Sequence, residues 1–363
     1  MDVTRHEPTP ARAWILAALT TPAVLIFISS NFVNVGNLAF NILFSRWMGP
    51  ELFGDLALIL TIKLSVLGVL GAVQMAVSQQ VSTHDFQNNQ CLPHLNRILF
   101  LGLLSGIPMA LFAVFWIDIG TLIDFSSPLS FVLLFICIPF AAPLSILRGL
   151  AFGTQSTGRI VLTANVEMGV RLFGAILAWH LGFGLNGVVM AIGLSIIAGW
   201  LVLADMMPKQ VPGSGQGPGQ LKSLGISAFP FAVLQLSQVI SLDGEIFLAS
   251  AFLPAEDAGY VGALSLFQRI EFFACFALAS VLLPSVVRAA NCPRQIMIAA
   301  APVLTIYFCV VFPFIVMVWF APEMIISILV GQGFLIIASA MVPAAISAAA
   351  FTLSYLLATL LIA

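Results

Sequence analysis

The stretch that decides the fold runs from Asn31 to Val81 and reads NFVNVGNLAFNILFSRWMGPELFGDLALILTIKLSVLGVLGAVQMAVSQQV. A Gly49–Pro50 break near its centre separates two long apolar runs. Such a break predicts a turn between two helices, and each run is long enough for a bilayer, which takes about 20 apolar residues. The stretch therefore predicts a transmembrane hairpin with one charge, Lys63, inside its second helix.

The composition of the whole chain agrees with this hairpin. Of its 363 residues, 61% are hydrophobic and only 8% are charged, whereas a soluble domain carries about 25% charged residues. A soluble protein of this size would need a larger wetted surface. Because the apolar runs are continuous rather than alternating, they exclude a strand-based barrel. The predicted fold class is an all-α polytopic membrane protein.

Several function classes are disfavoured by the residues that the chain lacks. A net charge of −2 leaves no basic surface for nucleic acid. The five cysteines are scattered without a CxxC pair, which predicts neither a metal site nor a disulfide framework. The sequence shows no nucleophile–base arrangement, so we expect no catalytic residues, no enzyme activity and no cofactor.

We predict about ten membrane spans and derive their orientation from the Lys and Arg residues. With the N-terminus in the cytoplasm, the outer side holds only Arg46. Such a bias predicts a cytoplasmic N-terminus. The cytoplasmic segments then hold Arg5, Arg12, Arg97, Arg148, Arg159, Lys209, Lys222, Arg288 and Arg294. The predicted spans are 14–44, 55–78, 97–117, 129–150, 160–180, 186–204, 223–252, 259–287, 297–320 and 334–363.

A Gly- and Pro-rich segment, Pro208 to Leu221, divides the chain and reads PKQVPGSGQGPGQL. It follows a membrane helix rather than a strand, and Pro218 interrupts its glycines, so it predicts a flexible connector and not a phosphate loop. The resulting domains are a six-helix lobe at 1–207, a cytoplasmic linker at 208–222 and a four-helix lobe at 223–363.

The two sides of the linker resemble each other at a spacing of about 204 residues. This spacing relates Asn31 and Asn34 to Gln235 and Gln238, and Pro50 to Pro254; it also relates Trp116 to Trp319 and Pro139 to Pro343. Two repeats with the same orientation, related by an axis along the membrane normal, are typical of transporters.

Three motifs carry a family resemblance. The turn RWMGPELFG at 46–54, the loop GLAFGTQSTGR at 149–159 and the turn PAEDAGY at 254–260 resemble segments of polysaccharide flippases. These belong to the multidrug/oligosaccharidyl-lipid/polysaccharide (MOP) superfamily. The resemblance implies a two-lobed transporter of the bacterial inner membrane. Members usually have two six-helix lobes, so we expect the second lobe of this sequence to lack its last helix pair.

The resemblance also implies an activity and its partners. The protein would flip a lipid-linked oligosaccharide or polysaccharide precursor from the cytoplasmic to the outer leaflet by alternating access. Its partners would be this substrate, membrane lipid, a coupling ion (H⁺ or Na⁺), and glycan polymerase or assembly proteins. Two alternatives stay open: a multidrug or cation exporter of the same superfamily, and a non-transporting scaffold in an envelope-glycan assembly.

Charged residues inside spans are the first candidates for substrate binding, since each costs about 2.5–3.5 kcal/mol at a helix centre. Lys63, Arg171 and Arg269 could hold a pyrophosphate or an acidic sugar, because ammonium and guanidinium groups bind phosphate. Alternatively, each could be a structural charge neutralised by a neighbour. Glu167 precedes Arg171 by four residues, on the same helix face.

Further candidates are polar or acidic. Amide side chains could line a sugar-accepting cavity, or could form interhelical hydrogen bonds; these are Asn31, Asn34, Gln235 and Gln238. Membrane carboxylates can carry a proton or bind Na⁺, although those near the end of a span could simply be wetted. The candidates for ion coupling are Asp243, Glu245 and Glu167. A cavity dominated by Asp243 and Glu245 would favour the cation exporter.

Overall fold

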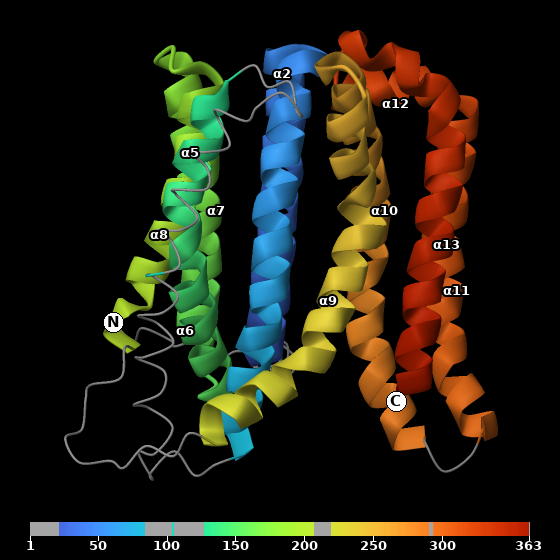
Figure 1. Ribbon diagram of the computed structural model, residues 1–363. Helices are drawn as coiled ribbons and strands as arrows, with labels where there is room; N and C mark the ends of the chain where they lie inside the picture. The colour runs from blue at the N-terminus through green and yellow to red at the C-terminus, as the bar shows by residue number, and fades with distance from the viewer. Residues whose placement is uncertain (1–21, 84–103, 105–126, 207–218, 290–292, 363) are drawn as a thin grey trace, which may run out of the picture. The chain divides into compact units, whose positions relative to one another are not determined.

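The computed structural model describes residues 22–83, 104, 127–206, 219–289 and 293–362, and across these ranges the chain is helical with no strand (Figure 1). This confirms the predicted fold class. The first half contains α2 (Pro22–Thr83), α5 (Pro128–Cys137), η1 (Ile138–Phe140), α6 (Ala141–Gly153), α7 (Thr157–His180), α8 (Gly184–Val202) and η2 (Ala204–Met206). The second half contains α9 (Gly219–Phe252), α10 (Ala255–Ala289), α11 (Pro293–Phe320), α12 (Pro322–Leu329), η3 (Gln332–Ile337) and α13 (Ala338–Ile362).

The predicted hairpin turn is a single residue inside α2. Gly49 has φ 72° and ψ 177°, which breaks the helix into two arms. A residue with a side chain rarely adopts such a positive φ, whereas glycine does so readily. Pro50 then opens the second arm, where its missing N–H costs no hydrogen bond. The turn predicted between the first two spans is confirmed, and the break in helical geometry is confined to Gly49.

Proline sets several of the other helix boundaries. Pro128, Pro293 and Pro322 are the first residues of α5, α11 and α12, the position at which the fixed φ of proline suits a helix. Pro139 lies in the short 3-10 segment η1, which interrupts the predicted span 129–150 between α5 and α6. The predicted span 97–117 lies almost wholly outside the described residues, and each of the other predicted spans has a helical counterpart.

The chain forms two compact units that interleave in sequence. Among the described residues, unit 1 comprises 22–37, 65–83, 104, 129–206 and 219–236, and unit 2 comprises 38–64, 127–128, 237–289 and 293–362. The lobe boundaries at 1–207, 208–222 and 223–363 stay a prediction.

Unit 1 is built on the pairing of α7 with α8 and on the packing of α6 against both. Its apolar core joins the end of α2 to α6 and α8, through Val77, Val81, Leu144, Leu147, Leu150 and Ile196. Unit 2 is built on α10, which packs against α11 and α13. Its core includes Val303, Tyr307, Val311, Ala349 and Leu356.

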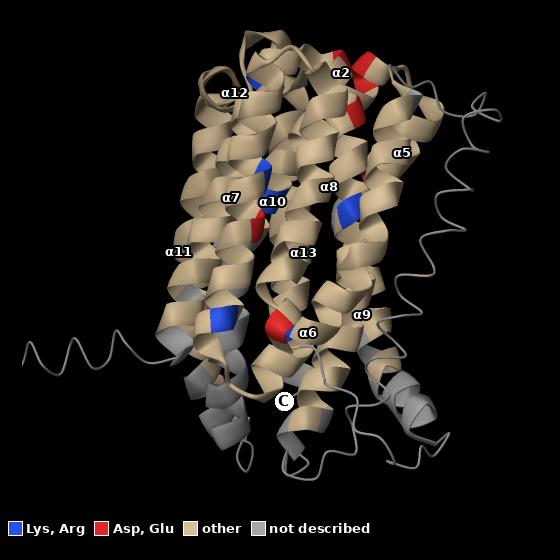
Figure 2. Cartoon of the chain, turned by 90° about the vertical axis from the view of Figure 1, so that its left-hand side faces the viewer, with Lys and Arg blue, Asp and Glu red and all other residues tan. Residues whose placement is uncertain are grey.

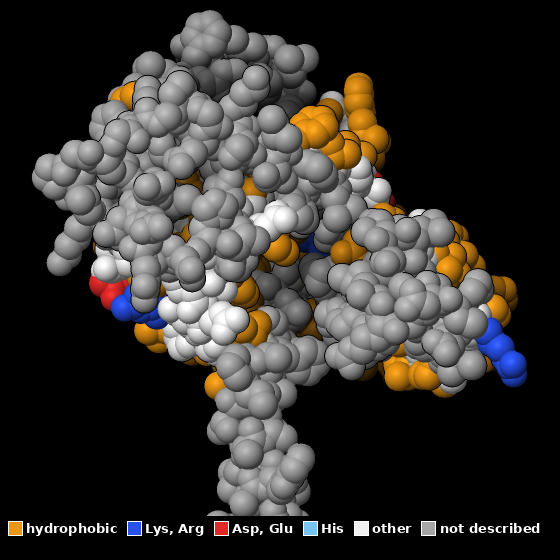
Figure 3. Space-filling model, turned by 90° about the horizontal axis from the view of Figure 1, so that it is seen from below, with side chains coloured by type: hydrophobic (Ala, Val, Ile, Leu, Met, Phe, Trp, Pro, Cys, Tyr) orange, Lys and Arg blue, Asp and Glu red, His pale blue; other side chains and the backbone are white. Residues whose placement is uncertain are grey.

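The outward surfaces of the helices are apolar, as a bilayer requires. Phe173 on α7 is 71% exposed and Phe320 on α11 is 81% exposed. Figure 3, which views the molecule from below, shows hydrophobic side chains over much of the visible described surface. Six described segments are long and apolar enough to cross a membrane: Ile28–Gln79, Leu129–Gly153, Thr157–His180, Gly184–Val202, Ala300–Phe320 and Gln332–Leu357. The chain is a multi-pass membrane protein.

Candidate functional site

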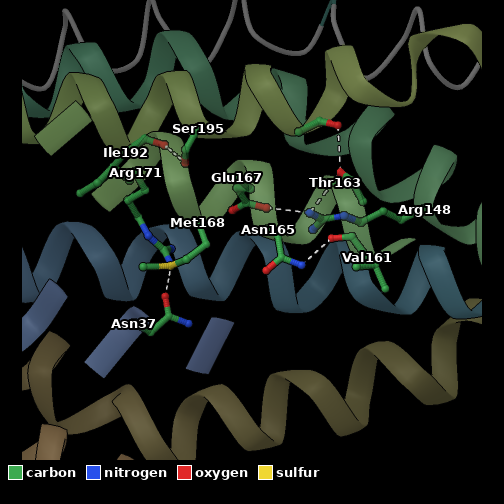
Figure 4. A network of polar contacts seen from close by, with 11 residues as sticks. Asn37, Arg148, Val161, Thr163, Asn165, Glu167, Met168, Arg171, Ile192 and Ser195 are labelled. Carbon is green, nitrogen blue, oxygen red and sulfur yellow. Dashed lines mark hydrogen bonds and ion pairs between the residues drawn. The ribbon is translucent and has the colours of Figure 1, made fainter. Parts of the chain in front are cut away.

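Charged side chains are sparse on the described helices (Figure 2), so each buried one is informative. In unit 1 they form a polar network around α7 (Figure 4). Arg148 of α6 forms an ion pair with Glu167 of α7, with 2.8 Å between Nη2 and Oε2. Thr163, one turn before Glu167, donates a hydrogen bond to the carbonyl oxygen of Gly199 on α8 at 2.9 Å. Together these contacts tie α6, α7 and α8 to one another.

α7 also contacts the first arm of α2, within unit 1. The Nδ2 of Asn165 donates to the Oγ of Ser29 at 2.7 Å. Arg171, two turns further along α7, donates to the Oδ1 of Asn37 (Figure 4). A second contact of Arg171 is with the sulfur of Met168, at 2.8 Å. α7 therefore makes polar contacts with α2, α6 and α8 inside an apolar unit.

This network adds to two expectations about unit 1. The helix spacing suggested Arg171 as the neutralising partner of Glu167; Glu167 does interact electrostatically with Arg171, and it also forms an ion pair with Arg148. Arg148 was placed in a cytoplasmic segment by the Lys and Arg count, yet its side chain is only 19% exposed. The reason is that α6 continues to Gly153 and α7 begins at Thr157, so Arg148 lies more than a helical turn inside α6.

Unit 2 holds the other two predicted basic residues. Lys63 on the second arm of α2 is 2% exposed. Arg269 on α10 donates from Nη2 to the Oγ1 of Thr61, also on α2, at 3.1 Å. Lys63 and Arg269 both have interaction partners in the described structure. Arg269 thus takes part in the contact between α10 and α2, and Lys63 is buried on the same arm of α2.

Two buried carboxylates are absent from the predicted site residues: Asp55 of α2, which has a partner, and Glu271. Glu271 lies on α10 in unit 2, is 2% exposed, and neither of its oxygens has a hydrogen-bond partner among the described residues. Residues two apart on a helix do not face each other. Arg269 reaches α2, and the ring of Phe272 lies against Phe351 and Tyr355 of α13. A carboxyl group in such a site keeps its proton or takes a cation.

The remaining predicted site residues are spread over both units. Asn31 and Asn34 are exposed on the first arm of α2, in unit 1. Gln235 in unit 1 and Gln238 in unit 2 are half-buried on α9. Glu245, also on α9, is half-buried and is not free. The side chain of Asp243 lies outside the described residues.

The structure thus brings Lys63, Arg269 and Glu271 into one unit and places Arg171 and Glu167 in the other. The signal that could have found Glu271 is its position: it lies between Ile270 and Phe272, well inside an apolar span. Among the described residues, no group of three or more His, Cys, Asp or Glu side chains is placed to hold a metal ion.

No protein-family model and no curated protein sequence matches this chain. Solved structures do match it. An inward-facing multidrug resistance MATE family transporter of the MOP superfamily aligns at 15% identity and a TM-score of 0.67, over 90% of this chain and 83% of that one. The eukaryotic MATE transporter AtDTX14 aligns at 17% identity and a TM-score of 0.60, over 91% and 81%.

The outward-facing conformation of a MATE family transporter aligns at 16% identity and a TM-score of 0.55, over 93% of this chain and 83% of that one. The likeness therefore extends over almost the whole chain and over transporters in both conformations. At these identities it shows the fold: the chain has the helical-bundle fold of MATE transporters of the MOP superfamily.

Proposed function

We propose that the protein is a MOP-type exporter that moves small organic molecules, cationic ones among them, across the membrane by alternating access. The observation that supports transport is the fold likeness, which spans 90% of the chain and includes relatives solved in inward-facing and outward-facing conformations. The multidrug or cation exporter, which was an alternative to the saccharide flippase, fits these relatives better.

The chemistry of unit 2 supports a cation rather than an anion at the site. Both carboxyl oxygens of Glu271 are buried without a hydrogen-bond partner among the described residues, and a buried carboxyl group is satisfied by a proton, a metal cation or an organic cation. Lys63 and Arg269 already have partners. An anionic pyrophosphate would have to displace those contacts before it could bind. Glu271 is therefore our candidate for binding the cationic substrate or the coupling ion.

A lipid-linked saccharide is the second candidate substrate. The three flippase-like motifs support it, and so do the exposed amides Asn31 and Asn34, which can donate to and accept from sugar hydroxyls. In that case Lys63, Arg269 and Arg171 would hold the phosphate groups, and glycan polymerase or assembly proteins would be candidate partners.

The decisive experiment uses purified protein in proteoliposomes with an imposed pH or Na⁺ gradient. Ethidium serves as the cationic probe, and a fluorescent lipid-linked oligosaccharide as the saccharide probe. We expect gradient-driven ethidium accumulation by the wild type and at least a tenfold loss in Glu271→Gln. The matched control is Glu323→Gln, which changes an exposed carboxylate of α12. Saccharide flipping without ethidium transport would establish the second candidate instead.

The location is part of the same proposal: the inner membrane of a bacterium, with the N-terminus and the 208–222 linker in the cytoplasm. A cysteine placed at Ser214, within the linker, tests the orientation. In intact cells a membrane-impermeant maleimide should leave Ser214→Cys unlabelled, and permeabilised cells should show full labelling. Efficient labelling of intact cells would reverse the assigned topology.

A further inference from the structure

The segment between the last two predicted spans contains a helix that hydropathy alone does not explain. The predicted spans 297–320 and 334–363 leave residues 321–333 outside the bilayer. In the structure α12 occupies most of this segment and packs against α11 and α13, at the upper end of unit 2 in Figure 1. The side chains of α12 therefore show what surrounds that end of the unit.

Two sides of α12 are those of a helix on a protein surface. Ile325 and Ile326 are buried against the rest of unit 2. Glu323 and Ser327 are four residues apart and so share a face of the helix. Glu323 is exposed and Ser327 is half-buried. One side of α12 thus faces protein, and another carries polar groups suited to water.

A third side of α12 is apolar and faces outward. Met324 and Ile328, which are also four residues apart, are 54% and 56% exposed. With about 3.6 residues per turn, this apolar stripe lies next to the face of Glu323 and Ser327. Scattered exposed apolar residues are common on soluble proteins, so the stripe becomes informative only through the surface that it continues.

The apolar stripe of α12 continues the bilayer-facing surface of α11. Large exposed apolar side chains recur every four residues along α11: Phe308, Phe312, Val316 and Phe320. The helix then breaks at Ala321, where φ is −141°, and α12 begins at the next residue. After α12, Leu335 and Ile336 of η3 are exposed as well. The stripe thus lies between two segments that present apolar side chains outward.

Trp319 indicates the depth of this surface in the membrane. It lies in the last turn of α11 and is 65% exposed. Tryptophan is enriched where membrane meets water, because its ring is apolar and its N–H group is polar. Since α12 begins three residues after Trp319, we expect α12 at the level of the lipid headgroups.

The C-terminal end of α12 has the backbone partners that such a position requires. A helix leaves its last carbonyls without intrahelical partners, and unsatisfied backbone groups are costly where water is scarce. Arg46 of α2 donates from Nη2 to the carbonyl oxygen of Ser327 at 3.2 Å and also to that of Ile328. These two carbonyls therefore need no water, and the guanidinium cation also complements the helix dipole.

We propose that α12 lies at the membrane–water interface and inserts Met324 and Ile328 among the acyl chains of phospholipids. Its three sides then face unit 2, the acyl chains and the headgroup water. The partner is the bilayer, because the stripe continues a surface that already faces it. The Lys and Arg distribution predicts that these lipids belong to the outer leaflet. This inference goes beyond the proposed function, since it does not depend on what the protein transports.

Spin labelling of the full chain in phosphatidylcholine nanodiscs tests the proposal. In a variant without native cysteines, Met324→Cys, Ile328→Cys and Glu323→Cys each receive a nitroxide in turn. Oxygen concentrates among acyl chains and a nickel chelate stays in water, so the ratio of their collision rates reports the medium. We expect this ratio at Met324→Cys and Ile328→Cys to exceed that at Glu323→Cys at least threefold. Phe312→Cys on α11 is the control for full lipid exposure.

Two results would overturn the proposal. A ratio at Met324→Cys and Ile328→Cys equal to that at Glu323→Cys would place the apolar stripe in water. Low collision rates with both reagents would show that a second copy or another protein covers it. Because either position on the stripe answers the question, one variant that does not fold leaves the test intact. The measurement uses no substrate, so its outcome is separate from that of the transport assay.

Discussion

Two buried carboxylates, Glu167 of unit 1 and Glu271 of unit 2, differ in their surroundings. In unit 1, Glu167 forms an ion pair with Arg148 that joins two helices. In unit 2, Glu271 is buried more deeply than Glu167, and its oxygens have no hydrogen-bond partner among the described residues. A buried pair offsets most of its own desolvation cost, whereas a lone buried carboxyl group does not. The comparison separates a charge that holds helices together from one that is left available for a ligand.

The largest effect should follow from breaking the pair in unit 1. Arg148→Ala leaves the Glu167 carboxylate buried without its cation, and we expect a loss of about 3 kcal/mol or more in the free energy of unfolding. Thermal unfolding in detergent, followed by size-exclusion chromatography, measures it. Arg148→Met combined with Glu167→Leu should recover most of the loss. If the double variant is no better than Arg148→Ala, the ion pair is not the source of the effect.

An intermediate effect should follow from removing the hydroxyl group that Arg269 uses in unit 2. Thr61 is fully buried, and Thr61→Val keeps its shape while removing the acceptor. A hydrogen bond to a charged group contributes about 1.5–3 kcal/mol, so the melting temperature should fall by less than in Arg148→Ala. Thr61→Ser retains the acceptor and serves as the control. Equal losses in Thr61→Val and Thr61→Ser would assign the effect to packing.

Glu271→Gln should change stability little and transport strongly, which inverts the pattern of unit 1. Removing an unpartnered buried carboxyl group breaks no described hydrogen bond, so we expect a change within about 1 kcal/mol in either direction. Paired thermal unfolding and ethidium transport assays, on the same preparation, measure both. A destabilisation as large as that of Arg148→Ala would place Glu271 among the structural charges and end the contrast between the units.

The smallest effect should come from the exposed ion pair of unit 1. Arg159 and Asp205 lie 2.6 Å apart, but their side chains are 44% and 59% exposed. Exposed pairs contribute about 0–1 kcal/mol because water and salt screen them. The melting temperature of Arg159→Ala should therefore lie within a degree or two of that of the wild type, at low and high salt alike. A loss well above about 1 kcal/mol would show that solvent does not screen this pair as its exposure indicates.

The fold class could be read from the sequence because the bilayer leaves few choices. Apolar runs of bilayer length must be helices, since every backbone group in hydrocarbon needs an internal partner. The Gly49–Pro50 turn was equally readable, because glycine and proline each permit a specific backbone conformation there. The short helix α12 was missed, since local interruptions barely change the hydropathy of a long run.

The partner of each charge was decided by tertiary structure. The four-residue spacing suggested Arg171 for Glu167, and the structure adds an ion pair with Arg148 of another helix, nineteen residues away in sequence. The same holds for Arg269 and Thr61, which are separated by 208 residues. Sequence spacing predicts interaction partners only within one helix. A partner on another helix depends on which helix faces pack against each other.

The sequence by itself determined that this chain crosses the membrane repeatedly, that it turns at Gly49 and that it resembles the MOP superfamily. The length of an apolar run and the backbone conformation of a turn are local properties, because they depend on residues that are consecutive in sequence. The tertiary structure alone decided that Gly54 of α2 and Gly259 of α10 lie in close backbone contact, that Arg46 donates to a carbonyl of the last turn of α12, and that Glu271 is buried with no hydrogen-bond partner among the described residues. These contacts form only when segments that are distant in sequence pack against one another, so consecutive residues do not reveal them.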